Sequence, residues 1–360
     1  MKQRYQIKYS VVILSIIFEM GSKLKEQRET LQYMLHTIVY DTAFSPCGKY
    51  LAAGNKFGDV AVFSLQSALA PDVRLEARCP VFTFSVFNSG SIYSMISTET
   101  LLICSGEGDI QGFKWADILG KNPKVIWSHT IPKKGVFSNP EVNSCVISQR
   151  NESNTLFAGA GDSDVHMWDM DSGTYKGCLS GHTDYIHAVV TKDNGQGLIS
   201  ASEDGTARVW DLRSKDSVHI IKPFENETCA RPDMGKWLQC LAINNENYWL
   251  LLGGGPTMAA WHLKTLTPAA TFDTPGATQN VAMFYEDKVF SGGSSAVFNQ
   301  WNITGDLSLA VPVSPSSVYS LDVNTKSASN KVMIVAGSSS EIDVCTNFGY
   351  KAFSLNFLPS

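Results

Sequence analysis

The chain has 360 residues, and 44% of them are hydrophobic, which is enough to fill a sizeable core without disulfide or metal staples. Its formal net charge is -5, from 29 lysine and arginine residues against 34 aspartate and glutamate residues. This balance excludes the positive excess that supplies sequence-independent nucleic-acid binding, so we expect any work near RNA to be done through other proteins. The eight cysteines form no Cys-x-x-Cys pair, and we predict that they are reduced and mostly buried.

The N-terminal segment has a basic start followed by an apolar run at residues 11–18. That run is too short to span a bilayer as a helix, and no small-x-small cleavage site follows it. We interpret residues 1–30 as a disordered N-terminal extension, with Met20 as a candidate true start. A signal or anchor segment and a short docking helix are the alternatives. Residues 31–360 are predicted to form a single domain.

One pattern recurs seven times from Tyr40 onward. It consists of an apolar strand, a polar turn, a strand ending in small residues and glycine, a tight turn, and a strand that usually closes on an aromatic residue. The predicted closing residues are Phe63, Trp115, Trp168, Trp210, Trp261, Trp301 and Cys345. Their spacing of about 40 to 53 residues fits one four-stranded propeller blade per unit, with loops absorbing the excess.

The fourth unit carries three dipeptides in order, Gly181-His182, Asp204-Gly205 and Trp210-Asp211. These motifs resemble those of the WD-repeat family, and the other six units are degenerate versions of them. The resemblance implies an all-β fold, a seven-bladed WD-repeat β-propeller in one domain. It also implies a buried chain of hydrogen bonds across the fourth blade, through His182, Ser200, Asp204 and Trp210.

The same residue types could instead form a catalytic Ser/His/Asp arrangement. That chemistry needs an exposed serine beside an oxyanion hole, and no Gly-x-Ser-x-Gly sequence supplies it. We therefore predict no catalytic residue, no cofactor and no enzymatic activity. Five histidines show no carboxylate or cysteine partner at ligand spacing, so no metal site is expected: His129, His166, His187, His219 and His262.

Recognition is expected on loops that the strands hold rigid. The longest irregular insertions are predicted at residues 64–80, 118–141 and 222–237. The third insertion supplies candidate partner-binding residues of types that anchor interfaces, namely Arg231, Pro232, Lys236 and Trp237. The alternative is a linker in which Trp237 simply enters the core.

Propeller closure can be achieved from either end of the chain. Strand-like segments occur at residues 31–39 and 350–357. In the usual WD-repeat arrangement the N-terminal strand becomes the outer strand of the last blade. The sequence leaves both ends open for that place.

Within the WD-repeat family, several passages are similar to the subunits of the THO complex. They are residues 45–55, 179–187, 203–213, 229–237, 253–263 and 347–357. The resemblance implies a nuclear, non-enzymatic scaffold in the THO/TREX assembly, which couples transcription and processing to mRNA export. Expected partners are other, largely helical THO/TREX subunits in a higher-order oligomer, with the messenger ribonucleoprotein contacted indirectly. No membrane and no small-molecule substrate is expected.

The alternative function is a substrate receptor of a cullin-RING ubiquitin ligase. Such receptors are often WD-repeat propellers with a Trp-Asp-x-Arg sequence, and residues 210–213 supply one copy. Arg213 is therefore a further candidate partner-binding residue.

Overall fold

The computed structural model describes residues 31, 33, 36–71, 74–133, 139–150, 153–193 and 195–357. The predicted extension at residues 1–30 lies outside this part. The chain divides into two compact units, Met1–Thr37 and Ile38–Ser360. In the first unit Leu31, Tyr33 and His36 are helical, so the strand predicted from residue 31 is wrong there. None of the helices in the described ranges has the length and apolar character needed to cross a membrane.

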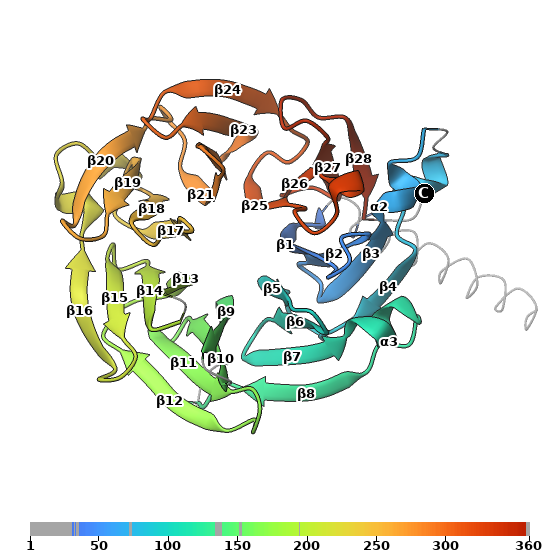
Figure 1. The fold of residues 1–360 in the computed structure, drawn as a ribbon, viewed down its shortest axis with the longest axis horizontal. Coiled ribbons are helices and arrows are strands. Elements are labelled where there is room, and N and C mark those ends of the chain that lie inside the picture. The colour runs from blue at the N-terminus through green and yellow to red at the C-terminus, as the bar shows by residue number, and fades with distance from the viewer. Residues whose placement is uncertain are drawn as a thin grey trace, which may run out of the picture. The chain divides into compact units, whose positions relative to one another are not determined.

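The second unit contains seven sheets, each built from four consecutive antiparallel strands. The sheets follow one another as blades around a common axis (Figure 1). This arrangement confirms the predicted seven-bladed WD-repeat propeller.

The strands of blades one to four are β1 (Val39–Phe44), β2 (Tyr50–Asn55), β3 (Asp59–Ser64), β4 (Phe82–Ser85), β5 (Ser94–Ser97), β6 (Leu101–Ser105), β7 (Asp109–Lys114), β8 (Val125–Thr130), β9 (Val142–Arg150), β10 (Ser153–Ala160), β11 (Asp164–Asp169), β12 (Tyr175–Ser180), β13 (Ile186–Lys192), β14 (Gly197–Ser202), β15 (Ala207–Asp211) and β16 (Asp216–Ile221). Blades five to seven contain β17 (Leu238–Ile243), β18 (Trp249–Gly254), β19 (Met258–His262), β20 (Thr267–Phe272), β21 (Gln279–Tyr285), β22 (Lys288–Gly293), β23 (Ser295–Asn302), β24 (Leu307–Pro312), β25 (Val318–Val323), β26 (Met333–Gly337), β27 (Glu341–Cys345) and β28 (Phe353–Asn356). Short helical turns interrupt the connections at α2 (Leu65–Ala68), η1 (Leu75–Arg78), α3 (Trp115–Leu119), η2 (Pro223–Glu225), η3 (Pro232–Met234) and η4 (Ala328–Asn330).

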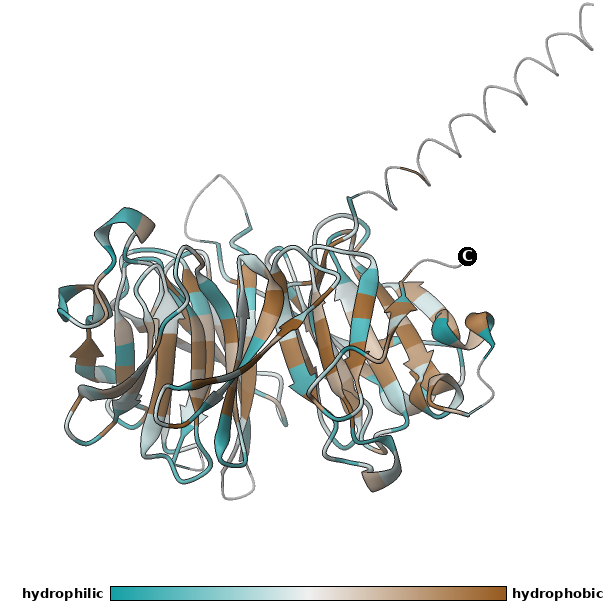
Figure 2. Ribbon diagram, turned by 90° about the horizontal axis from the view of Figure 1, so that it is seen from above, coloured by the Kyte–Doolittle hydropathy of each residue, from teal (hydrophilic) through white to brown (hydrophobic). Residues whose placement is uncertain are grey.

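The strands differ in burial according to their place in the blade. The second strand of blade four, β14, is buried at every residue, because neighbouring blades cover both of its faces. The fourth strand, β16, is mostly exposed. In Figure 2 hydrophobic residues are concentrated along the strands and the connecting loops are more hydrophilic. All eight cysteines are free, and five of them are buried in this packing.

Strand register corrects two predictions in blade two. Leu198 pairs with Trp210 in blade four, and at the equivalent place Leu102 pairs with Phe113. The closing residue of the second unit is thus Phe113, and the predicted Trp115 is wrong, because it begins α3 after the strand has ended. The insertion predicted as irregular at residues 118–141 contains β8, in which half-buried and exposed residues alternate as in an outer strand.

Polar side chains at one level of the inner strands link successive blades. Each accepts a hydrogen bond from a backbone N–H of the next blade: Asp41 from Met95 at 2.7 Å, Ser94 from Cys145 at 3.3 Å and Ser144 from Val189 at 3.2 Å. These contacts hold the first four blades together at the centre of the ring.

The ring is closed by the C-terminal end of the chain. β28 is the outer strand of blade seven, so the open choice between the two ends falls to residues 350–357. Blade one is complete with its own four strands and exchanges none with blade seven. The two blades instead share a buried cluster that joins Phe63 and Leu65 to Ile334 and Leu355, and they stand side by side in Figure 1. Closure therefore depends on side-chain packing.

Candidate interaction surfaces

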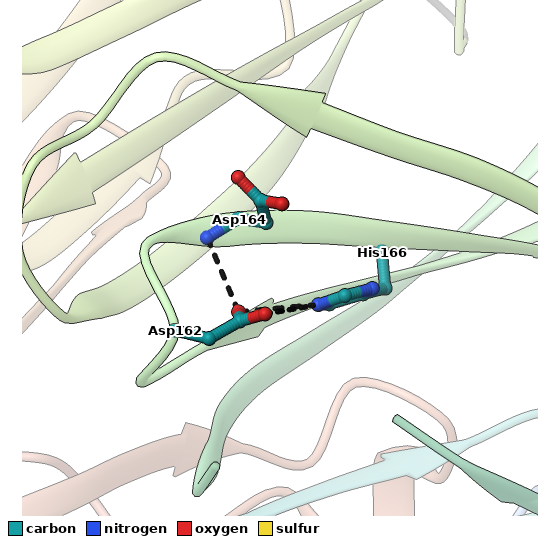
Figure 3. Close-up of side chains that lie close together, drawn as sticks. All are labelled: Asp162, Asp164 and His166. Atoms are coloured by element: carbon teal, nitrogen blue, oxygen red, sulfur yellow. Dashed lines mark hydrogen bonds and ion pairs between the residues drawn. The ribbon is translucent and has the colours of Figure 1, made fainter. Parts of the chain in front are cut away.

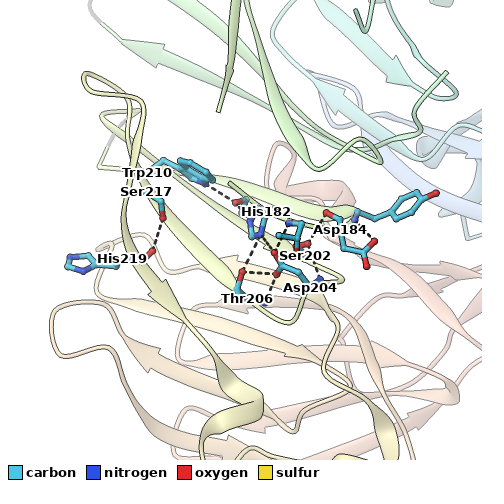
Figure 4. Close-up of polar contacts among 11 residues, drawn as sticks. His182, Asp184, Ser202, Asp204, Thr206, Trp210, Ser217 and His219 are labelled. Atoms are coloured by element: carbon cyan, nitrogen blue, oxygen red, sulfur yellow. Dashed lines mark hydrogen bonds and ion pairs between the residues drawn. The ribbon is translucent and has the colours of Figure 1, made fainter. Parts of the chain in front are cut away.

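Blade four contains a buried chain of four polar side chains (Figure 4). His182 lies in the loop between β12 and β13, and its Nδ1 is 2.8 Å from Asp204 Oδ2. Its Nε2 is 2.7 Å from Ser200 Oγ. Trp210 Nε1 donates to the same Ser200 oxygen at 2.8 Å. Since an indole N–H only donates, the serine hydroxyl is left to donate to the histidine.

The carboxylate of Asp204, which lies in the turn before β15, accepts hydrogen bonds from further donors. It accepts hydrogen bonds from the backbone N–H of Thr183 at 3.1 Å and from both the N–H and the hydroxyl of Thr206 at 2.8 and 2.7 Å. Burial would raise the pKa of Asp204, but the hydrogen bonds from His182 and Thr206 outweigh it and hold that pKa well below its usual range. Because Ser200 is fully buried and both its neighbours occupy its oxygen, no substrate reaches it as a nucleophile.

The degenerate blades keep only parts of this chain. In blade six Trp301 Nε1 still donates to Ser291 Oγ at 2.9 Å. In blade five Leu252 holds the register position that Ser200 holds in blade four. Trp261 Nε1 is accordingly buried with no hydrogen-bond partner among the described residues.

Blade three replaces the missing loop histidine with one from its own strand (Figure 3). His166 Nε2 lies 3.1 and 3.2 Å from the two oxygens of Asp162, and its Nδ1 lies 2.8 Å from the hydroxyl of Tyr175. The expectation that His166 has no carboxylate partner is wrong, because the tight turn folds residues 162 and 166 together. It is also wrong for His187, whose Nε2 is 2.6 Å from Glu203 Oε2.

The blade-three cluster has side chains of the types that bind metal ions. Ligand atoms of Asp162, Asp164 and His166 all lie within 4.8 Å of one another. Both ring nitrogens of His166 already have partners, however, and Asp162 Oδ1 also accepts the backbone N–H of Asp164 at 3.3 Å. The cluster is satisfied by its own hydrogen bonds, and we assign no metal to it.

The loop at residues 222–237 is organised by Arg231. Its guanidinium donates to five backbone carbonyls, those of Gly255 at 2.9 Å, Thr274 at 3.2 Å, Ala277 at 2.9 Å, Gly254 at 3.3 Å and Pro256 at 3.4 Å. Burial lowers the pKa of Arg231. These contacts use the guanidinium of Arg231 to hold the loop in its conformation. Pro232 and Lys236 are exposed, and Trp237 is half-buried.

Arg213 lies apart from that loop, in the connection between β15 and β16. Its side chain is 80% exposed, and its Nη2 is 2.8 Å from Asp211 Oδ2. Hydrogen bonds from Arg213 lower the pKa of Asp211 to about 2. Trp210, Arg213 and Val218 border a cavity of about 240 Å³. Arg213 is therefore accessible to a partner.

A second cavity, of about 280 Å³, was not expected from the sequence. It lies between the inner strands β1, β5 and β25, and Asp322 lines it. The signal that could have revealed it is the charged residue Asp322 at a position where the inner strands of the other blades have an aliphatic residue or methionine.

Comparison with known proteins places the chain among its relatives. The family model "WD domain, G-beta repeat" matches residues 173–211, which cover most of blade four. The chain is 40% identical over 324 residues to the THO complex subunit 6 homolog of Danio rerio, covering 90% of this chain and 98% of that protein. It is 38% identical over 335 residues to THO complex subunit 6 of Homo sapiens, with 92% and 96% covered, and 31% identical over 313 residues to that of Drosophila melanogaster, with 86% of each covered. The chain belongs to the THO complex subunit 6 family of WD-repeat proteins.

Proposed function

We propose that this chain is a non-enzymatic scaffold subunit of the nuclear THO/TREX complex. In this role it supports assembly of the complex and couples transcription and processing to nuclear mRNA export. The observation that carries the proposal is its similarity, over nearly the whole propeller, to relatives named as THO complex subunit 6. Its partners are then the other, largely helical THO/TREX subunits, and a higher-order oligomer forms through them.

The engagement of the polar residues inside blade four and the negative net charge both support a protein-binding role. Ser200, His182 and Asp204 are engaged with one another inside blade four, where they stabilise the fold. The net charge of -5 favours contact with other proteins over direct contact with the phosphate backbone. The exposed Pro232 and Lys236 are proposed as part of the partner-binding surface.

A second candidate function is that of a substrate receptor for a cullin-RING ubiquitin ligase. The observation in its favour is the exposed Arg213 of the Trp-Asp-x-Arg sequence, beside the 240 Å³ cavity. Under this reading Arg213 contacts the ligase adaptor.

Affinity purification of the tagged protein from nuclear extract, after nuclease treatment, separates the two functions. We expect THO subunits in stoichiometric amounts by mass spectrometry, and the same set with the Arg213→Ala variant. Recovery of a cullin adaptor without THO subunits, abolished by Arg213→Ala, would overturn the proposal. Nuclease treatment ensures that co-purification does not arise from shared RNA.

A further inference from the structure

The cavity of about 280 Å³ lies at the seam where blades seven, one and two meet near the centre of the ring. Its exposed lining residues are Glu99, Thr325 and Lys326, which follow the ends of β5 and β25. The cavity therefore opens at the rim formed by the C-terminal ends of the inner strands. Its inner wall includes Ala43 and Asp322.

Asp322 stands out when the seven inner strands are aligned by register. In the other six blades, the equivalent positions hold only aliphatic side chains or methionine: Ala43, Ile96, Val146, Val190, Ala242 and Met283. Such side chains pack between blades and gain from leaving water. A carboxylate at this level gives up that gain. Asp322 is half-buried, and even partial burial of its charge is unfavourable without a partner.

The two carboxylates near the cavity differ in how well they are satisfied. Asp41 accepts hydrogen bonds from the N–H groups of Thr42 and Met95 and from the hydroxyl of Ser320. For Asp322, among the described residues, the backbone N–H of Val323 is the one donor that lowers the pKa of the carboxyl. Burial, and then the charge of Asp41, raise the pKa of Asp322 to about 8. Among the described residues, no lysine, arginine or histidine lowers the pKa of this acid.

The charged side chains at the mouth do not fill that need. Lys326 Nζ lies 3.6 Å from Glu99 Oε1, and both side chains are more than half exposed. A weak surface pair of this kind leaves the inner carboxylate without a counter-ion.

We propose that this cavity is a binding site for an arginine side chain of a partner protein, with Asp322 as the anchor that ionises when the guanidinium binds. A guanidinium is favoured because it is weakly hydrated, planar and able to donate two parallel hydrogen bonds to one carboxylate. The volume exceeds that of a single ion or water, whose share of liquid volume is about 30 Å³, and suits an extended side chain. The proposal does not depend on which assembly the chain joins.

Isothermal titration calorimetry of the full chain tests the proposal with three probes. They are N-acetyl-arginine methylamide, its neutral isostere N-acetyl-citrulline methylamide, and free L-arginine. We expect the blocked arginine to bind at least about tenfold more tightly than the blocked citrulline, and at least as tightly as free arginine. The reason is that the cavity binds the guanidinium side chain and does not need the free amino and carboxyl groups. Equal binding of arginine and citrulline, or binding of neither, would overturn the proposal. Preference for free arginine would assign the cavity to a small molecule and overturn the protein partner.

Variants locate the site. Asp322→Asn keeps the shape of the side chain and is expected to weaken arginine binding about tenfold or more, whereas Glu99→Gln at the mouth should change it less than about twofold. Ala43→Val narrows the cavity without altering charge and should also weaken binding. Circular dichroism melting confirms that each variant is folded. Unchanged affinity in both Asp322→Asn and Ala43→Val would place the arginine elsewhere and contradict the inference.

Discussion

Replacement of Asp204 with alanine should destabilise the propeller, because the carboxylate serves as acceptor for three separate residues. The change leaves the N–H groups of Thr183 and Thr206 without their acceptor, and it leaves the Nδ1–H of His182 with only the hydroxyl oxygen of Thr206, 3.2 Å away. Hydrogen bonds to a charged group contribute about 1.5 to 3 kcal/mol each. Thr183 is exposed and Thr206 half-buried, so water replaces part of the loss there, whereas His182 is buried. The expected cost is about 3 to 4 kcal/mol of unfolding free energy.

Thermal unfolding, followed by tryptophan fluorescence and near-ultraviolet circular dichroism, measures this effect. Over the roughly 320 residues of the propeller, a cost of that size lowers Tm by about 4 to 6 °C. Because the folded-state pKa of Asp204 lies below its usual value, its contribution is present above about pH 4 and is lost as the pH falls further, so the difference between wild type and variant should shrink in acid. The matched control is Asp162→Ala, which should cost less, since Asp162 is half-buried whereas Asp204 is buried, and water can replace part of the lost contacts there. An unchanged Tm combined with loss of partner binding would refute the structural role of Asp204.

Three further predictions follow from single contacts. Trp301→Phe should cost about 1 kcal/mol more than Trp261→Phe in urea unfolding, because only Trp301 loses an indole hydrogen bond; equal costs would contradict this. Asp322 has a folded-state pKa of about 8, above its unfolded value, so its stabilising contribution is present below about pH 4 and is lost as the pH rises to 8. Asp322→Asn should remove this loss and raise the unfolding free energy at pH 8 by about 1 to 3 kcal/mol, whereas a variant less stable than wild type at that pH would count against it. Arg231→Gln should speed amide hydrogen exchange at residues 222–237, and unchanged exchange would show that its five carbonyl contacts are dispensable.

The repeat could be predicted from the sequence because each blade has the same local order of strand and turn. Register places Trp168, Trp210, Trp261 and Trp301 where that order predicts. The error at Trp115 has a physical reason. In the sequence an aromatic residue one position past the strand end resembles one within the strand, and only the pairing of Phe113 with Leu102 distinguishes them.

Contacts between turns and loops were beyond the reach of linear spacing. His166 and Asp162 meet because a tight turn reverses the chain, and His187 meets Glu203 because the start of β13 pairs with the end of β14. Arg231 has the composition of an interface anchor, yet its carbonyl partners come from segments 23 to 46 residues away. The residue type of a side chain predicts which contacts it can make. The tertiary fold decides whether these contacts are made with a partner protein or with the backbone of the same chain.

The proposed arginine site lies beside the seam where blades one and seven close the ring. Because blade one and blade seven exchange no strand, their inner contact depends on side chains such as Asp41 and Ser320, whose oxygens lie 3.2 Å apart. An aliphatic residue in place of Asp322 would avoid the cost of partly burying a charge beside this seam, so the chain gives up stability there. A guanidinium bound there contacts β1, β5 and β25 together. Since the unfolded chain offers no such site, the bound partner stabilises the closed ring by mass action.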